Sequence, residues 1–210
     1  WFLGHRIREA MKDDKSGPLG GEGQVIEVDE TYLRPVPRDD SPATFVNGYG
    51  WQGRPGQKPD AIKVVTLVER KGRARSVKVE HLNAETVGKI VRENADRAST
   101  LYTDEARFYP KIGREFAKHE TITHSKGEYA RGDVSTNVVE GYFSVFKRGM
   151  RGTYQHCKEQ HLHRYLSEFD FRYSKRQALN VDDVARTEAA IRGILGKRLT
   201  YQTARSQAGV

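Results

Sequence analysis

The 210-residue sequence has one cysteine, Cys157, which excludes disulfide bonds within the chain. Such scarcity favours a reducing compartment, so we expect a cytoplasmic protein. No apolar run approaches the roughly 18 residues of a membrane span, and no signal-peptide pattern is present, so we expect no membrane partner. An initiator methionine is also missing, and Trp1 stands inside an apolar pattern of helical spacing, so we expect an upstream part.

Acidic residues are the minority charge. The chain has 28 Asp and Glu against 36 Lys and Arg, a net charge of +8 and a pI near 9.5. A polyanionic partner is therefore expected, and nucleic acid before membrane lipid, because no basic segment carries a wide apolar face. The length fits one domain with a hydrophobic core.

Apolar periodicity and turn residues predict the secondary structure. The expected elements are a helix at 1–12, a joint at 16–23, a strand at 25–33, a loop at 34–59 with at most a short strand in 43–49, a hairpin of 61–68 and 74–81 turning at Gly72, a helix at 83–96, a strand at 99–103, a helix at 107–118, a strand at 119–124, and helices at 136–154, 158–173 and 182–196. This order predicts an α/β, RNase-H-like fold: a mixed five-stranded sheet flanked by helices, with extra C-terminal helices.

Acidic residues interrupt the apolar strand at 25–33. Ile26, Val28 and Tyr32 share one face of that strand, whereas Glu27 and Asp29 share the other face with Thr31. Such charges inside a hydrophobic strand call for a function.

The helix at 136–154 divides into two faces. The expected apolar stripe consists of Val138, Tyr142, Val145, Phe146 and Gly149. The opposite face consists of Asn137, Glu140, Ser144, Lys147, Arg148 and Arg151. This polar face combines a carboxylate, an amide one turn earlier and cations two turns later.

Three carboxylates would meet in the expected fold. Asp29 lies in the first strand, Asp104 follows the strand at 99–103, and Glu140 lies on the helix at 136–154. The first and fourth strands of such a sheet are neighbours, so we expect a shared site for divalent cations. Hard oxygen ligands suit Mg²⁺ or Mn²⁺, and two such ions would activate an attacking oxygen and stabilise the leaving oxygen of a phosphodiester.

Four segments carry a specific resemblance: VIEVDETYL, LYTDEARFY, GEYARGDVSTNVVEGYFSVFKRGMRGTYQH and HLHRYLSEFDFRYSKR. They are similar to the catalytic domain of DDE transposases of bacterial insertion sequences, in particular the ISXO-like group. The resemblance implies an RNase-H-like fold, Mg²⁺-dependent cleavage at element ends and strand transfer by the freed 3′-hydroxyl. It equates Asp29, Asp104 and Glu140 with the acidic triad, and it implies DNA partners, self-association in the active complex and a bacterial, nucleoid-associated location.

The resemblance also assigns roles on the helix at 136–154. Lys147 matches a basic residue that contacts DNA phosphate, and Asn137 is either a metal ligand or an orienting group, because some relatives use asparagine in the third position. Before Thr136, where relatives commonly have His, this chain has Ser135. In domain terms, 1–20 resembles the end of an upstream helix-turn-helix-like region, 24–176 the catalytic domain, and 177–210 a helical tail.

Further basic residues favour a phosphate-binding surface. The expected DNA contacts are Lys147, Arg148, Arg151, Arg164, Arg172 and Lys175, interleaved with Tyr154, Tyr165 and Tyr173. Zinc binding by His156, Cys157, His161 and His163 is disfavoured, because His161 and His163 diverge on a helix and paired cysteines are absent. Two alternatives to a transposase remain: a metal-dependent nuclease without strand transfer, and a transposase-derived DNA-binding protein lacking cleavage.

Overall fold

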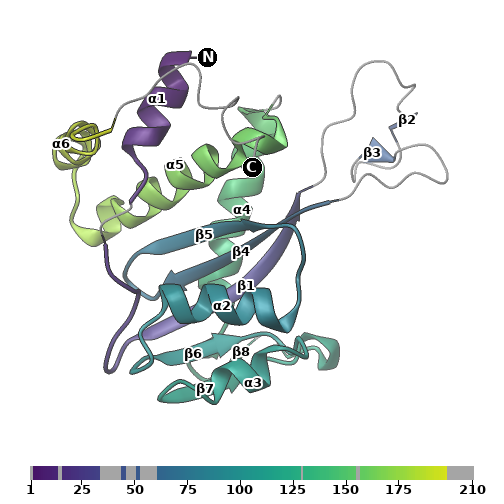
Figure 1. Ribbon diagram of the computed structural model, residues 1–210. Coiled ribbons are helices and arrows are strands. Elements are labelled where there is room, and N and C mark those ends of the chain that lie inside the picture. Colours follow the sequence, from purple (N-terminus) through teal and green to yellow (C-terminus); the bar gives the residue numbers. More distant parts are fainter. Residues whose placement is uncertain are drawn as a thin grey trace, which may run out of the picture.

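A mixed sheet forms the centre of the molecule (Figure 1). The computed structural model describes residues 2–13, 16–33, 44–45, 51–52, 61–128, 130–154 and 157–197. Within them, five strands pair in the order β5-β4-β1-β6-β7. They are β1 (Val25–Leu33), β4 (Ile62–Glu69), β5 (Ala74–Val79), β6 (Thr100–Thr103) and β7 (Lys118–Thr121). The β5-β4-β1 pairs are antiparallel and the β1-β6-β7 pairs parallel, which confirms the expected α/β, RNase-H-like fold.

Helices cover both faces of the sheet (Figure 1). One apolar core joins the sheet to α2 (Ala84–Asn94) and α3 (Tyr109–Gly113), and the other joins it to α4 (Asn137–Gly152) and α5 (Leu162–Ser174). Helix α1 (Phe2–Ala10) packs beside α5, and α6 (Asp183–Arg192) packs beside α1. The short elements are β2 (Thr44–Phe45), β3 (Trp51–Gln52), β8 (Ala130–Arg131), β9 (Val134–Ser135) and 3₁₀ turns at His124–Lys126, Glu159–His161 and Gln177–Leu179.

Helix α5 also closes the β5 edge of the sheet. The Asp170 carboxylate accepts the Ser76 N–H at 2.8 Å, and the Ser174 hydroxyl accepts the Ala74 N–H at 3.0 Å. The same carboxylate accepts the Tyr142 hydroxyl of α4 at 2.6 Å. Burial raises the pKa of Asp170 to about 6 despite these donors. The edge strand is therefore satisfied by side chains rather than left open for pairing.

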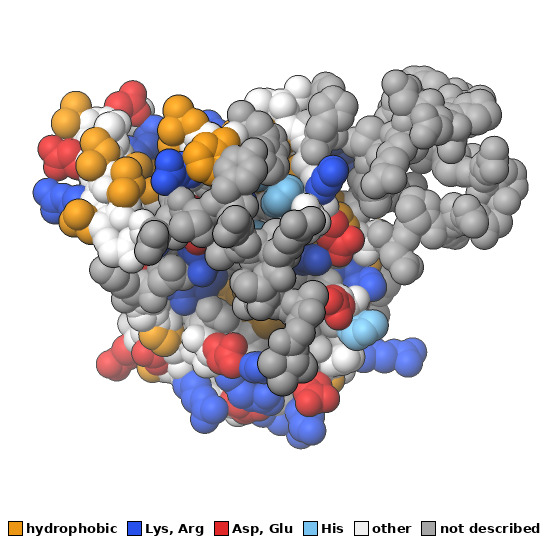
Figure 2. Space-filling view, turned by 45° about the horizontal axis from the view of Figure 1, so that its top comes forward, with side chains coloured by type: hydrophobic (Ala, Val, Ile, Leu, Met, Phe, Trp, Pro, Cys, Tyr) orange, Lys and Arg blue, Asp and Glu red, His pale blue; other side chains and the backbone are white. Residues whose placement is uncertain are grey.

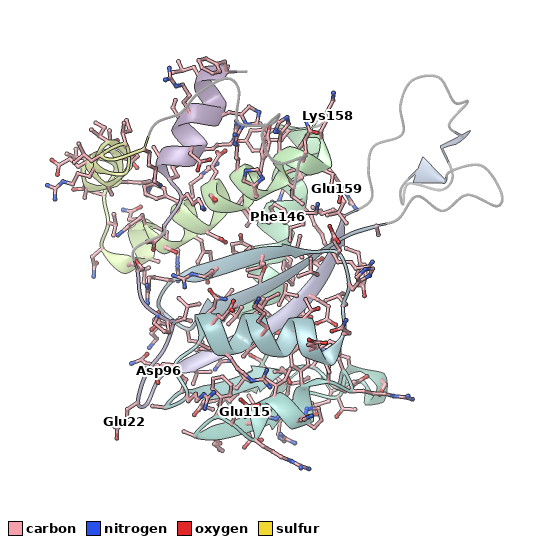
Figure 3. All side chains as sticks on the ribbon, viewed as in Figure 1. Glu22, Asp96, Glu115, Phe146, Lys158 and Glu159 are labelled. Atoms are coloured by element: carbon pink, nitrogen blue, oxygen red, sulfur yellow. The ribbon has the colours of Figure 1, made fainter. Side chains whose placement is uncertain are left out.

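The two helices on this face meet closely. Phe146, labelled in Figure 3, is fully buried on α4 and contacts the Phe169 ring edge-on, with ring centroids 5.1 Å apart. A Cβ atom at Gly149 would stand 2.4 Å from the Phe169 ring, so only glycine permits this approach. Gly149 thus belongs to the buried face of α4, as the sequence pattern predicts.

The other buried residues of α4 differ from the predicted apolar stripe. Val139, Tyr142, Phe143, Phe146 and Met150 are its buried residues. Val145, expected inside, is 56% exposed, and Val138 is only partly buried. The helix contacts both the sheet and α5, so its buried arc is wider than one stripe and includes side chains next to the predicted ones.

Two predicted elements around β6 are longer than the observed ones. The helix expected at 107–118 is only α3, because Ala117 N–H donates to Arg97 O and the residues from Lys118 onward pair with β6. The strand expected at 119–124 is β7, which ends at Thr121 because its partner strand ends at Thr103. In the β4-β5 turn the positive φ, 58°, belongs to Lys71 rather than Gly72.

Several exposed apolar side chains gather over α1 and α6 (Figure 2). They are Phe2, Leu3, Ile7, Val184, Ile191, Ile194 and Leu195. Among the described helices, none combines the length and apolar content required to cross a membrane. Of the loop expected at 34–59, only β2 and β3 are described, and residues 198–210 of the expected tail also lie outside the described part.

Candidate active site

Asp29 and Asp104 lie on neighbouring strands. In the parallel pairing of β1 with β6, Val28 stands opposite Thr103, so Asp29 and Asp104 are the next residues along the two strands. The Asp29 carboxylate accepts the backbone N–H of the next residue, Glu30, at 2.7 Å. The Asp104 carboxylate accepts the Ala106 N–H at 3.0 Å. The adjacency expected from the element order is thus present.

Three other carboxylates act on the pKa of Asp29. Burial raises the pKa of Asp29 from its ordinary value of 3.8 to about 7, and the charges of Glu30, Asp104 and Glu140 raise it further against one backbone hydrogen bond. Burial also raises the pKa of Asp104, while the Ala106 N–H and His124 act in the opposite direction. Negative charges from β1, β6 and α4 therefore act on one point.

Glu140 is held in the first turn of α4. The Thr136 hydroxyl donates to Glu140 Oε1 at 2.8 Å. His124 Nε2 lies 3.6 Å from the same oxygen and 3.3 Å from the Thr136 hydroxyl oxygen. The Glu140 side chain is 47% exposed, so it remains accessible to a ligand. Sequence reasoning missed Thr136 and His124; His124 was expected only as the last residue of a strand.

A buried carboxylate connects α4 to β1. Glu27, fully buried, accepts the backbone N–H groups of Val138 and Val139 on Oε2 at 2.8 and 3.0 Å. Arg70 Nε donates to Glu27 Oε1 at 2.6 Å. The sequence pattern indicates Glu27, because it shares a strand face with Asp29. No sequence pattern indicates Arg70, which lies in a polar turn.

The donor set suits a hard divalent cation, because it consists of carboxylate oxygens. Within the part of the chain that the structure describes, however, no three His, Cys, Asp or Glu side chains are grouped to hold one metal ion. Glu140 is bound to Thr136 instead, and Asn137 is exposed at the start of α4. Asp29 and Asp104 come together through the sheet, whereas Glu140 is hydrogen-bonded to Thr136 and acts on Asp29 only through its charge.

A shallow, open groove with a cationic lining lies on the exposed side of α4. Lys147, Arg148 and Arg151 line it together with Ser144 and Gly152. These are three of the six basic residues expected to contact DNA, and they follow Glu140 on the same helix. A positive groove of this kind fits phosphate groups.

The remaining three basic residues lie on or just after α5. Arg164 Nε is 3.5 Å from Glu9, and Arg172 is 3.6 Å from Glu168, while Lys175 follows the end of the helix. The tyrosines expected among them face inward: the Tyr154 hydroxyl donates to Glu168 at 2.6 Å, and Tyr165 is 7% exposed.

The residues weighed for zinc, which the sequence disfavours, form no metal-holding group in the described part of the chain. His156 lies outside that part, and the His161 ring instead contacts the His5 ring with centroids 4.9 Å apart. Burial raises the pKa of the Cys157 thiol to about 11, so it stays protonated.

Comparison with known proteins identifies the family of the chain. The profile of the family described as the ISXO2-like transposase domain matches residues 18–174, about three quarters of the chain. The matched region contains β1, β6 and α4 with Asp29, Asp104 and Glu140. No curated protein matches the sequence. By the extent of the profile match, the chain belongs to the ISXO2-like transposase domain family.

Proposed function

We propose that this chain cleaves DNA strands at the ends of an insertion element and joins the freed 3′-hydroxyl to target DNA. Asp29, Asp104 and Glu140 are the proposed catalytic carboxylates. The observation that carries the proposal is the position of Asp29 and Asp104, which directly follow the paired residues Val28 and Thr103 of β1 and β6. Burial and the charges of Glu30, Asp104 and Glu140 raise the pKa of Asp29, which supports it. Carboxylates gathered in this way repel one another unless cations neutralise them.

Asp29 and Asp104 would hold the cations, and Glu140 would join them by turning its carboxylate away from the Thr136 hydroxyl. Two Mg²⁺ or Mn²⁺ ions would supply the activation of the attacking oxygen and the stabilisation of the leaving oxygen. Cleavage breaks a P–O3′ bond with water as the nucleophile and frees the 3′-hydroxyl of the element. In strand transfer that 3′-oxygen would form a bond to a target phosphorus while the target strand's own P–O3′ bond breaks and leaves a 3′-hydroxyl on the target. The protein contributes ligands and alignment of the strands.

DNA backbone would follow the groove of α4. Lys147, Arg148 and Arg151 line this groove beyond Glu140, so phosphates bound there lead toward the carboxylates. Arg164, Arg172 and Lys175 would extend the contact along α5; Arg164 and Arg172 already pair with Glu9 and Glu168, so each contributes less charge than a groove cation. Asn137, exposed one turn before Glu140, would orient the site or act as a further ligand.

Self-association on the DNA and a place at the bacterial nucleoid complete the proposal. A transposase joins element ends to target DNA, and a single-chain site of three carboxylates acts on one strand at a time. Native mass spectrometry of the chain bound to element-end DNA tests the association, and two or more chains in one complex are expected.

An assay with labelled element-end DNA and Mg²⁺ tests the activity. Strand-transfer products are expected from the wild-type chain and none from Asp104→Asn. Hydrolysis without transfer would mean a nuclease, and bound but uncut DNA would mean a DNA-binding protein; either result contradicts the proposal. Omitting Mg²⁺ controls for metal dependence.

A further inference from the structure

The N-terminus of α4 is capped by a distant residue. Thr136 occupies the N-cap position, but its side chain makes no capping hydrogen bond, because its hydroxyl donates to Glu140. The first N–H groups of a helix have no partner within the helix and need acceptors from elsewhere. Glu27 accepts two of them, from Val138 and Val139, across 111 and 112 positions of sequence. A carboxylate is also favoured at this end of the helix dipole.

The second oxygen of Glu27 fixes the chain before the helix. Arg70 donates to it at 2.6 Å, and the same guanidinium donates to Asp133 O at 2.6 Å and to the Ser135 hydroxyl at 2.8 Å. Glu27 is fully buried and Arg70 is 25% exposed at the side chain. With donors on both oxygens and no room to rotate, the carboxylate has one orientation. Helix α4 and the β8-β9 hairpin before it are thus tied to one point on β1.

That point lies two residues before Asp29. Residues two apart on a strand point to the same face, about 7 Å from each other. Glu27 therefore places the first turn of α4, which carries Glu140, over the strand that carries Asp29. Glu140 follows the two residues that Glu27 holds, Val138 and Val139, in the same turn of α4.

We infer that Glu27, through its contacts with Arg70 and the α4 N-terminus, is a positioning residue that keeps Glu140 beside Asp29 and Asp104. This inference rests on the proposed function, because it concerns how the third carboxylate reaches the metal ligands. Glu27 itself touches neither cation nor DNA. It acts by setting the position and rotation of α4 before any ligand binds.

The substitution Glu27→Gln tests this with little change in volume. An amide has one oxygen and one NH₂ group, so a donor must face either the helix N–H groups or Arg70, which are donors themselves. One of the two contacts is lost, and a buried group is left without a partner. Arg70→Lys is a milder second variant, because lysine keeps the charge but cannot donate at once to Glu27, Asp133 and Ser135.

Asp170→Asn provides a matched control. Asp170 is a second carboxylate that ties α4 to the sheet, through Tyr142 and Ser76, but it does so beyond the first turn of the helix. The melting temperature of Asp170→Asn is measured beside that of Glu27→Gln, so that the affinity of each variant is compared with its stability. The comparison of the two variants therefore distinguishes the effect of a general loss of stability from the effect of a displaced Glu140.

The experiment measures Mn²⁺ affinity calorimetrically on the full chain, below the melting temperature of each variant. Outer residues that orient metal ligands typically contribute 10–100-fold in affinity, so Glu27→Gln should weaken Mn²⁺ binding by about tenfold and Arg70→Lys by less. Asp170→Asn should bind Mn²⁺ like the wild type. Without metal, hydrogen exchange at the Val138 and Val139 amides should be faster in Glu27→Gln than in Asp170→Asn.

The double variant Glu27→Gln/Glu140→Gln tests whether Glu27 influences Mn²⁺ affinity through Glu140. Because Glu27 acts through Glu140, the double variant should bind Mn²⁺ no more weakly than Glu140→Gln alone. Two results would overturn the inference while leaving the proposed function standing. One is that folded Glu27→Gln binds Mn²⁺ as tightly as the wild type. The other is that Glu27→Gln weakens Mn²⁺ binding by the same factor in the Glu140→Gln variant as in the wild type. If Glu27→Gln does not fold, Arg70→Lys decides by the same criteria. If the wild type does not bind Mn²⁺, or if Asp104→Asn binds it as tightly as the wild type, the proposed function is wrong and this inference fails with it.

Discussion

Replacing Asp29 by Asn removes a carboxylate that the folded chain accommodates poorly when ionised. Burial and the charges of Glu30, Asp104 and Glu140 raise its pKa to about 7. A group whose pKa is higher in the folded state stabilises the fold below its unfolded pKa, and this contribution is lost as the pH rises through the folded pKa. The relevant window therefore runs from about pH 4 to pH 7. Above it, Asp29→Asn should be more stable than the wild type when no divalent cation is present.

The size of the gain follows from the two pKa values. A rise from 3.8 to about 7 corresponds to at most about 4 kcal/mol, at about 1.4 kcal/mol per pKa unit. Asp29 is partly exposed, and solvent screening reduces this figure, so we expect about 1–3 kcal/mol at pH 8. For a chain of this size that is a rise of roughly 3–10 °C in melting temperature.

Thermal melting in EDTA at pH 4, 6 and 8 measures the effect. The melting temperature of Asp29→Asn should exceed that of the wild type at pH 8, by less at pH 6, and by nothing at pH 4. Glu22→Gln is the matched control, since it removes the same charge from an exposed residue at the lower edge of the molecule (Figure 3). An unchanged or lower melting temperature of Asp29→Asn at pH 8, or a gain that is independent of pH, would refute the reasoning.

Three further predictions concern DNA. Asp104→Asn should lower Mg²⁺-dependent cleavage by several orders of magnitude while element-end binding persists, and cleavage at the wild-type rate would exclude the assignment. Glu140→Gln should abolish cleavage whereas Asn137→Ala keeps a measurable fraction; the reverse result would identify Asn137 as the ligand. Lys147→Ala should reduce the salt dependence of DNA binding by about one unit of slope, with Ser144→Ala in the same groove as the control, and an equal slope in both would remove Lys147 from the DNA path.

Strand patterns in the sequence predicted the sheet because alternation and turn residues are local signals. The hairpin of β4 and β5 and the N-cap of α2 both follow from short motifs: Asn83 accepts the Thr86 N–H at 2.8 Å, as an N-cap residue should. Where strands end, however, depends on their partners. β7 stops at Thr121 because β6 stops at Thr103, and no pattern within 119–124 contains that information.

The buried face of α4 shows the same limit. A helical wheel ranks stripes by their own hydrophobicity, so Val145 entered the predicted stripe and Val139 did not. The choice depends on what the helix meets, and here it meets the sheet on one side and the Phe169 ring of α5 on the other. Phe143 is buried for that reason although it lies beside the predicted stripe.

In the candidate site, element order was enough to place Asp29 beside Asp104, because Asp29 lies in β1 and Asp104 directly follows the adjacent parallel strand β6. It was not enough to find Glu27 or Arg70, whose roles depend on contacts over 111 and 63 to 65 positions of sequence. Local sequence reasoning treats Ser135 as a departure from the resembling family. In the structure its hydroxyl accepts from Arg70 at 2.8 Å, so the residue before Thr136 takes part in holding α4.

The acidic residues of β1 each connect this central strand to a different element. Glu27 binds the N-terminus of α4, Asp29 faces Asp104 after β6, and Glu30 accepts the Tyr109 hydroxyl of α3 at 2.8 Å. Strand alternation sends Glu27 and Asp29 to the α4 face and Glu30 to the α3 face. Two of these contacts are structural and one remains available for ligands. A one-residue slip of β1 would exchange the faces and break all three contacts at once, so the register that buries Ile26 and Val28 also assembles the carboxylates.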